Sequence, residues 1–470
     1  MEEITSLSAA EMAAGIREKK FSLTELVDAH LRRIEMLEPK LHAFATVDAE
    51  RVRSAAQAAT EAATNSKVMG PLQGVPVTIK SSIDVAGLRC AAGSRLRAEY
   101  VPGQDAPLVA RLKAAGAIVL GNTNVPEMLM AYETNNLLNG RTNNPWDLAR
   151  TPGGSSGGEA AAIAARCSAA GVGSDGGGSV RVPAHFSGIC GHKPTPGRIP
   201  STGHFPPSAG PFAHLGVVGP MARSVEDLKI LFEVMAGPDT GDAAFAPVPV
   251  RWPKKGFERR TRIGYFEEDG RTPVTAETRA AVRKAAEALR ARGFEVVEFR
   301  PEGLERARQL WWNLFVRAGA LMLGPMLEGH EQEISPLLKE FRAIEAAGPR
   351  LTLGELMMTL IERDTLRTQF FAQMERYPIL LCPVAAIPAF RHGEREWQVD
   401  GKRVEYLDAM SYTQWFNLLG NPGTVVPVGK SPEGLPIGVQ VVGRLYEDEM
   451  ALAVAEKIEA VCGRFAAPMI

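Results

Sequence analysis

Glycine and serine are concentrated in one short segment of the chain. Nine glycines fall among the 26 residues from Gly153 to Gly178, and serines stand between them. Clustered glycines permit positive φ and a close backbone approach to a ligand, and successive amides beside a helix start can bind an anion. The bound anion could be a phosphate or the oxyanion of acyl transfer. Because no phosphate-binding G-x-x-x-x-G-K-[ST] motif is present, and no G-x-G-x-x-G in a suitable strand–helix setting, the sequence favours acyl transfer.

Seven motifs in a fixed order connect this segment with the rest of the chain. They are Gly74–Lys80, Asn144–Trp146, Gly153–Glu159, Asp175–Arg181, Gly188–Thr195, Gly197–Arg198 and Gly434–Gln440. As a set they resemble the amidase signature family, over most of the chain and most weakly across 240–375. The resemblance implies the family fold, a single α/β/α sandwich around a large mixed, twisted β-sheet, and no cofactor.

The same resemblance implies a Ser–cis-Ser–Lys triad. Carried over by position, the nucleophile is Ser179, the bridging serine is Ser155 and the base is Lys80. The two serines are 24 residues apart (179 − 155), as in the family, although the neighbouring Ser156 could also be the bridge. A serine hydroxyl needs an adjacent base, and burial can lower the pKa of a lysine enough for that task. A cis peptide bond is expected before Ser155.

The glycines form two clusters, the first in residues 153–158 and the second in residues 171–178. The family's oxyanion hole falls on four consecutive amides that begin in the second glycine cluster. Asp175 and Arg181 flank this loop and are expected to brace it through charge-assisted hydrogen bonds. A larger residue is frequent in the family at the first of the four positions, so glycine there is expected to widen the acyl site. The four amides are those of Gly176, Gly177, Gly178 and Ser179.

By similarity to fatty-acid amide hydrolases in the family, Leu129, Met130 and Tyr132 are expected to line the acyl pocket, although such a stripe could also be ordinary core. Trp311 and Trp415 are expected to form further apolar walls. The helical segment 303–372 could be a lid or pocket wall, a dimer surface or a membrane face. It lacks the basic polar face typical of membrane docking, so a lid or pocket wall is favoured.

These residues predict a serine hydrolase that cleaves the C–N bond of carboxamides, and related aryl esters or carbamates, through an acyl-enzyme. The expected substrate is a small molecule of apolar character. The alternative is the glutaminase (A) subunit of a tRNA-dependent amidotransferase, which shares the signature. Glu159 after Gly157-Gly158 is more typical of stand-alone amidases. A catalytically inactive scaffold is hard to reconcile with three occupied triad positions, and a homodimer is left open.

Capped helices and buried strands must position these side chains. Ser8 and Ser22 each begin an S/T-x-x-E capping box, and apolar residues after the second box repeat with helical period until Pro39. Amphipathic segments then alternate with short apolar runs, which predicts an α/β fold with a mixed, mostly parallel sheet covered on both faces. Helices are expected at 105–115, 276–292 and 447–460, and strands at 75–79, 117–120, 262–266, 294–299, 379–384, 424–428 and 438–442.

The pattern is interpreted as one amidase domain over residues 1–470. Its expected parts are N-terminal helices in 1–65, a signature core in 66–236, a proline-rich surface connection in 237–256 and C-terminal strands with a helix in 373–470.

Composition excludes several classes of protein. The formal net charge is −1 (53 − 54), without the basic excess typical of nucleic-acid or anionic-membrane binding. Five cysteines without a C-x-x-C pair argue against a disulfide framework, and the histidines form no zinc motif, so no metal is expected. No apolar run is long enough to span a bilayer, and no signal peptide is evident at Met1. A cytoplasmic enzyme is therefore expected.

Overall fold

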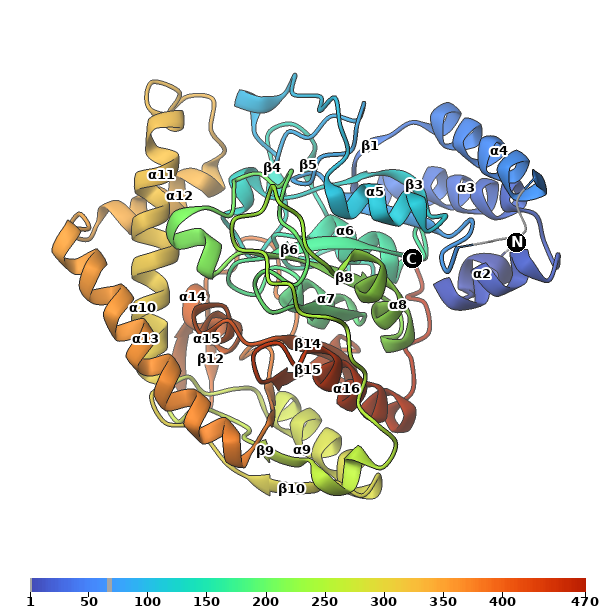
Figure 1. Ribbon diagram of the computed structural model, residues 1–470. Coiled ribbons are helices and arrows are strands. Elements are labelled where there is room, and N and C mark those ends of the chain that lie inside the picture. The colour runs from blue at the N-terminus through green and yellow to red at the C-terminus, as the bar shows by residue number, and fades with distance from the viewer. Residues whose placement is uncertain (1, 66–69) are drawn as a thin grey trace.

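The computed structural model describes residues 2–65 and 70–470, and its centre is a twisted 11-stranded sheet (Figure 1). The strands lie in the order β1-β3-β2-β6-β8-β7-β14-β15-β11-β9-β10. Each of the seven predicted strands corresponds to one of them. The bounds are β1 Phe44–Val47, β2 Pro76–Lys80, β3 Ile118–Thr123, β6 Ala170–Asp175, β7 Cys190–Lys193, β8 Val217–Ala222, β9 Arg262–Tyr265, β10 Glu295–Glu298, β11 Ile379–Pro383, β14 Gly423–Lys430 and β15 Pro436–Gly443.

The direction of the strands corrects one prediction. Parallel pairing is confined to β3-β2-β6 near one edge and β11-β9-β10 at the other, and the remaining six of the ten described pairings are antiparallel. The sheet is mixed, as predicted, but it is not mostly parallel. The prediction failed because a strand buried on both faces is a continuous apolar run whichever way it points.

Two hydrophobic cores lie on opposite faces of the sheet. In β11, Ile379 and Leu381 belong to one core, whereas Leu380 and Cys382 belong to the other. Successive side chains of a strand point to opposite faces, so this alternation assigns each core to one face. Helices that contribute to the first core include α5 (Pro107–Ala114), α8 (Val225–Met235), α9 (Ala276–Ala291) and α16 (Asp448–Cys462).

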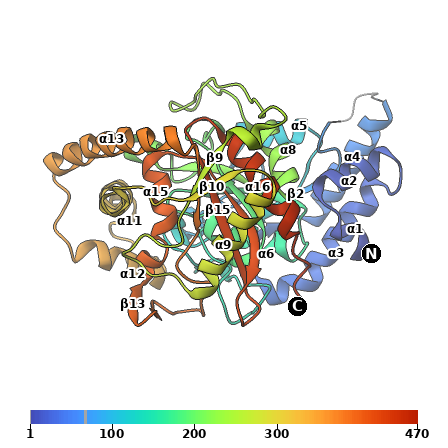
Figure 2. The same ribbon diagram turned by 90° about the horizontal axis from the view of Figure 1, so that it is seen from below.

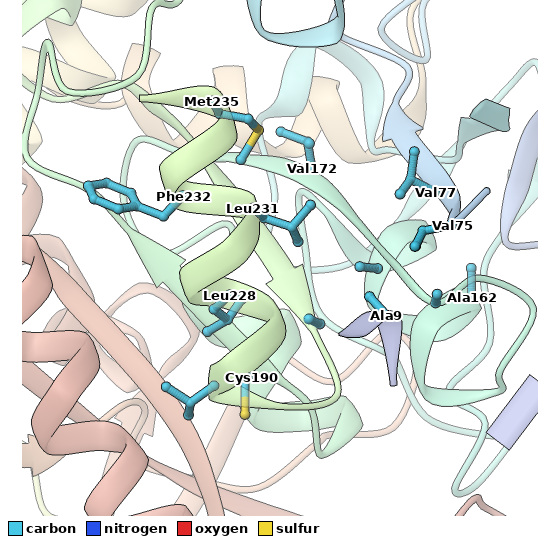
Figure 3. Close-up of a cluster of buried hydrophobic side chains, with 14 of the residues drawn as sticks. Ala9, Val75, Val77, Ala162, Val172, Cys190, Leu228, Leu231, Phe232 and Met235 are labelled. Atoms are coloured by element: carbon cyan, nitrogen blue, oxygen red, sulfur yellow. The ribbon is translucent and has the colours of Figure 1, made fainter. Parts of the chain in front are cut away.

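Figure 3 shows part of the first core, to which Leu228, Leu231, Phe232 and Met235 of α8 and Val172 of β6 all belong. The second core contains side chains of the short signature helices α6 (Gly157–Ala164) and α7 (Arg181–Ser187), and of α15 (Ser411–Leu419). The fold is therefore an α/β arrangement with helices against both faces of the sheet.

The N-terminal helices α2 (Ala9–Arg17), α3 (Leu23–Leu41) and α4 (Ala49–Asn65) lie together at one side of the molecule (Figures 1 and 2). Helix α4 contacts β3, α3 contacts α4 and β2, and α2 contacts α8. Both predicted capping boxes are present. Helix α3 continues past Pro39 to Leu41, contrary to the prediction that proline ends the pattern there. Proline removes only its own amide donor, and the His42 amide still donates to Glu38 O at 2.9 Å.

Residues 303–372 form a helical layer at one side of the molecule (Figure 1). A third cluster of buried apolar residues joins this layer to the 128–130 loop: Met128 and Met130 pack with Leu323, Leu327 and Leu338. The segment is thus part of the wall beside that loop. Its elements are α10 (Leu304–Trp311), a π-helix η5 (Trp312–Arg317), α11 (Ala318–Leu327), α12 (Pro336–Ala346) and α13 (Leu353–Arg376).

No helix within the described ranges 2–65 and 70–470 is long and apolar enough to cross a membrane. The connection 237–256, between α8 and the 3-10 turn at Phe257–Arg260, contains neither helix nor strand. It packs on the signature core, since the amide of Ala246 donates to Gly197 O at 2.9 Å and the carboxylate of Asp242 accepts the Ser201 hydroxyl at 2.9 Å.

Candidate active site

Two neighbouring parallel strands bring the lysine and the second glycine cluster together. Lys80 is the last residue of β2, and Asp175 is the last residue of β6, which pairs with β2 in parallel. The carboxyl ends of parallel strands meet at one edge of a sheet, and this is a common location for functional sites in α/β folds. Ser155 reaches the same place from the loop that leads into α6, and Ser179 from the loop between β6 and α7.

Lys80 is completely buried and contacts two serines. Its Nζ lies 2.7 Å from Ser155 Oγ and 2.9 Å from Ser174 Oγ. Burial lowers the pKa of Lys80 to about 7, although the nearby carboxyl groups of Asp175 and Glu159 oppose this shift. Near pH 7 the neutral and protonated forms of the amine are therefore both well populated. Ser174 was not predicted as a site residue, although it stands directly before Asp175 in the second glycine cluster.

The first glycine cluster presents Ser155, and not Ser156, to the lysine. The Gly154–Ser155 peptide bond is cis, as the family resemblance implied. Ser156 Oγ lies instead 3.3 Å from the backbone oxygen and 3.3 Å from the amide nitrogen of Ser174. Gly154 has no room for a side chain, because a Cβ there would lie 2.6 Å from the backbone of Glu133. Close packing against neighbouring backbone thus holds this loop at Lys80.

Ser179 lies at the surface of a cavity that Ser155 also lines, and we refer to it as the serine cavity. Ser179 is 7% exposed, and in the part of the chain that the structure describes its hydroxyl makes no hydrogen bond. The Ser156 amide donates to Ser179 O at 3.2 Å, which connects the two glycine clusters directly. The hydroxyl of Ser179 is therefore free to meet a ligand.

Asp175 and Arg181 form a buried ion pair inside the glycine loop. Arg181 Nε lies 3.0 Å from Asp175 Oδ2, and both side chains have zero exposure. Burial alone would raise the pKa of Asp175, but the Arg181 guanidinium reverses this effect and holds the pKa well below its ordinary value. Asp175 Oδ1 also accepts the Gly178 amide at 2.7 Å, and Oδ2 accepts the Val180 amide at 3.1 Å. The ion pair and these two amide bonds join both ends of the loop.

This bonding modifies the predicted oxyanion hole. The Gly178 amide is engaged by Asp175 and is not directed at a ligand. The amides of Gly176, Gly177 and Ser179 donate to no acceptor among the residues that the structure describes. Three of the four predicted amides are therefore available to bind an oxygen anion.

Helix α15 supplies support that the sequence did not reveal. Asn417 Nδ2 donates to Asp175 Oδ1 at 3.0 Å, and the Thr413 backbone oxygen accepts from Arg181 Nη2 at 2.9 Å. Gln440, the last residue of the C-terminal motif, accepts from Arg181 Nη1 at 3.0 Å. These polar residues come from distant parts of the chain, and only Gln440 belongs to a motif that could have indicated its importance.

A second cavity adjoins the serine cavity, and we refer to it as the aromatic cavity. Leu129 and Met130 line both cavities, and Tyr132 lines the aromatic one together with Trp311 and Phe315. Four of these, Leu129, Met130, Tyr132 and Trp311, are predicted pocket residues, whereas Phe315 of the helical layer was not predicted.

Two expectations about the pocket were wrong. Trp415 lines neither cavity, because it is buried in the second core, where its ring lies 4.9 Å from that of Tyr412. Gly176 does not widen the site, because Phe315 fills the space beside it: a Cβ on Gly176 would lie 2.6 Å from Phe315 Cε2.

His192 and His204 differ in their surroundings. His192 is buried, with Nδ1 2.9 Å from Thr424 Oγ1 and Nε2 3.3 Å from Asp448 Oδ1. His204, which sequence reasoning did not single out, lines the serine cavity, and its Nδ1 lies 2.8 Å from Pro206 O. Within the described ranges, no group of three or more His, Cys, Asp or Glu side chains is placed to hold a metal ion.

The fold and the side chains gathered at this edge define the class of the protein, a serine hydrolase built on an α/β sheet. The family model described as Amidase matches residues 25–452, and the chain belongs to this amidase signature family.

Relatives and a solved structure place the chain within this family. It is 34% identical over 461 residues to an indoleacetamide hydrolase of Bradyrhizobium diazoefficiens (97% of this chain, 86% of that protein). It is 36% identical over 492 residues to the A subunit of a glutamyl-tRNA(Gln) amidotransferase from Roseiflexus castenholzii (98% of this chain, 96% of that protein). A solved fatty acid amide hydrolase superposes with a TM-score of 0.88 at 25% identity, covering 99% of this chain and 86% of that one.

Proposed function

We propose that this protein is a stand-alone amidase that hydrolyses carboxamides through an acyl-enzyme on Ser179. The observation that carries the proposal is the contact of 2.7 Å between Lys80 Nζ and Ser155 Oγ. Because the neutral form of the amine is well populated near pH 7, its lone pair can accept the Ser155 proton while its own N–H groups donate to Ser174. The base and its bridging hydroxyl are thus in place before substrate arrives.

The reaction then follows in balanced steps. Ser179 Oγ attacks the carbonyl carbon, its proton passes to Ser155 Oγ, and the Ser155 proton passes to Lys80 Nζ. When the tetrahedral intermediate collapses, the C–N bond breaks and the proton returns through Ser155 to the departing nitrogen, which leaves as an amine or ammonia. Water attacks the acyl-enzyme by the same proton route, releasing the carboxylic acid and restoring Ser179.

The negative charge of the intermediate needs donors that are already oriented. We assign this role to the amides of Gly176, Gly177 and Ser179, because they belong to the loop that carries the nucleophile and donate to no acceptor among the described residues. Fixed donors of this kind stabilise a developing oxyanion strongly because they do not reorganise during the reaction. The bracing of the loop by Asp175 and Arg181 keeps it in the shape that presents these amides.

The two cavities hold different parts of the substrate in this proposal. The leaving nitrogen must face Ser155, which returns its proton, and Ser155 lines the serine cavity but not the aromatic one. The leaving group therefore occupies the serine cavity and the acyl group enters the aromatic cavity. Tyr132, Trp311 and Phe315 give that cavity an apolar wall, so the preferred acyl groups are aromatic or alkyl.

This division predicts the result of a substrate panel. Among primary amides of increasing acyl size, we expect kcat/KM to rise about fourfold per additional methylene group until the aromatic cavity is full, because each buried methylene contributes about 0.8 kcal/mol. Rates are measured by ammonia release, with acetamide and glutamine as small and polar comparisons. A preference for glutamine over phenylacetamide would contradict the proposed acyl site.

The second candidate is the glutaminase component of a tRNA-dependent amidotransferase, which the 36% identity to such a protein supports. The two functions differ in what the isolated chain can do. A stand-alone amidase hydrolyses aryl amides when purified alone, whereas a component that depends on partners is inactive by itself. Aryl amide hydrolysis by the purified chain therefore separates the candidates.

Covalent labelling tests the identity of the nucleophile. We expect a fluorophosphonate to modify Ser179 in a 1:1 ratio, because this hydroxyl faces the serine cavity beside unengaged backbone amides. Mass spectrometry of peptides from the labelled protein locates the adduct. An adduct on Ser155 or Ser156 would reverse the assignment of roles.

A further inference from the structure

Two carbonyl groups of the glycine loop are held by side chains from three distant parts of the chain. Trp311 Nε1 donates to Gly176 O at 2.9 Å. Tyr132 Oη and Thr413 Oγ1 each donate to Gly177 O at 2.8 Å. Gly177 O thus has two donors, whereas Trp311 is the one donor to Gly176 O among the described residues.

Because the peptide group is planar, a carbonyl group that is held in place also orients the N–H of the next residue. Carbonyl and N–H of one trans peptide point in opposite directions, so a fixed C=O also fixes the N–H of the next residue. The peptide between Gly177 and Gly178 is fixed at both ends, since its amide donates to Asp175. The peptide between Gly176 and Gly177 is fixed only by Trp311, and its amide is one of the three that remain free.

Glycine makes this orientation easy to lose. Residues without Cβ populate many backbone conformations at similar cost, so the peptide between two glycines can rotate when nothing holds it. Rotation would replace the free Gly177 amide by the carbonyl oxygen of Gly176. An acceptor would then stand where the reaction needs a donor for the oxyanion.

Trp311 is well fixed for the task of preventing that rotation. Its side chain is 1% exposed, and its ring stacks on Phe315 with centroids 4.8 Å apart and planes at 11°. The π-helix Trp312–Arg317 follows it directly. Such π-turns are rare and often occur at functional sites. The same indole lines the aromatic cavity, so it touches both the loop and the space assigned to the acyl group.

We propose that Trp311 is a positioning residue, whose indole N–H holds the Gly176–Gly177 peptide with its amide directed at the oxyanion. This inference rests on the proposed function, because it needs Ser179 to form a tetrahedral intermediate. It also gives the helical layer 303–372 a second task, since α10 both forms the acyl wall and keeps the oxyanion hole assembled.

The first test removes the indole N–H donor of Trp311 and keeps an aromatic ring at this position. In Trp311→Phe we expect kcat for a good aryl amide to fall roughly 10-fold to 100-fold, somewhat less than the loss of a direct oxyanion donor, with KM changed less than twofold. A boronic acid inhibitor, which forms a tetrahedral adduct, should lose affinity by the same factor as kcat/KM. Affinity for the carboxylic acid product should stay within twofold. The control is Trp312→Phe, which should retain the kcat of the wild type.

A second variant guards against misfolding or a change of ring size. Site-specific incorporation of 3-benzothienyl-alanine at Trp311 substitutes sulfur for the N–H in a ring of nearly the same shape, and we expect the same loss of kcat and of boronate affinity. Wild-type kcat in this variant, or a change in KM alone, would overturn the positioning role. Fluorophosphonate labelling of the wild-type protein is run in parallel: absence of an adduct on Ser179 refutes the proposed function itself, and an adduct without a Trp311 effect refutes only this inference.

Discussion

Ser179→Ala should lower kcat for amide hydrolysis by a factor on the order of 10⁴–10⁶, because a reaction through an acyl-enzyme has no route without the nucleophile. The protein should stay folded, since Ser179 is 7% exposed and its hydroxyl makes no hydrogen bond within the described part of the chain. Stopped and continuous assays of ammonia release measure the rate, and thermal unfolding checks that the midpoint is unchanged.

The matched control is Ser208→Ala, a serine that lines the same cavity and has no place in the proposed proton route. It should keep most of the wild-type activity. Ser155→Ala and Ser156→Ala then separate the two neighbouring serines: only the first should approach the defect of Ser179→Ala, because Ser155 and not Ser156 lies against Lys80. A Ser179→Ala enzyme with substantial amidase activity would refute the acyl-enzyme.

Lys80→Ala should lower amide hydrolysis by about 10²–10⁴-fold, the usual contribution of a positioned general base. Burial lowers the pKa of Lys80 from its ordinary value of 10.5 to about 7. Below pH 7 the amine is protonated and cannot accept the Ser155 proton, and above pH 7 it is neutral. In the wild type kcat/KM should therefore rise about tenfold per pH unit up to about pH 7 and then level off, because one proton must be lost.

Two variants and two substrates test whether Lys80 causes this pH dependence of kcat/KM. Lys80→Ala should lose the rise near pH 7, and Lys80→Arg should not restore activity, since a guanidinium stays protonated. The defect should be smaller on an activated ester than on a matched amide, whose departing nitrogen must be protonated. A Lys80→Ala enzyme that hydrolyses the amide at near wild-type rate from pH 6 to 9 would exclude the proposed base.

Short sequence patterns predicted helix starts, several strands and the candidate site residues of this protein. The capping boxes at Ser8 and Ser22 appear as predicted because a cap depends on residues three positions apart. Seven strands were found from short apolar runs, and the motifs of the family led to Lys80, Ser155 and Ser179, two of which the structure shows in contact and the third in the same cavity.

Strand β6 shows the limit of such local signals. The sequence Ala170–Asp175 has two glycines and lies beside the glycine-rich loop, and apolar patterning does not predict a strand there, yet it is a central strand. Gly171 is required because a Cβ would lie 1.8 Å from Glu159 Oε1. The space available at that position is set by a helix that packs on the strand, and no window of the sequence contains that information.

The residue types of the site and their order can be read from the sequence alone. The reaction requires a nucleophile, a base and a glycine loop, and each of them lies in a short motif that is visible in the sequence. Which atoms meet is set by the folded chain: Ser155 rather than Ser156 reaches Lys80, Asp175 engages the Gly178 amide, and Trp311 rather than Trp415 stands at the pocket. These contacts join segments that can be hundreds of residues apart. They depend on packing across the sheet, which local propensity does not specify.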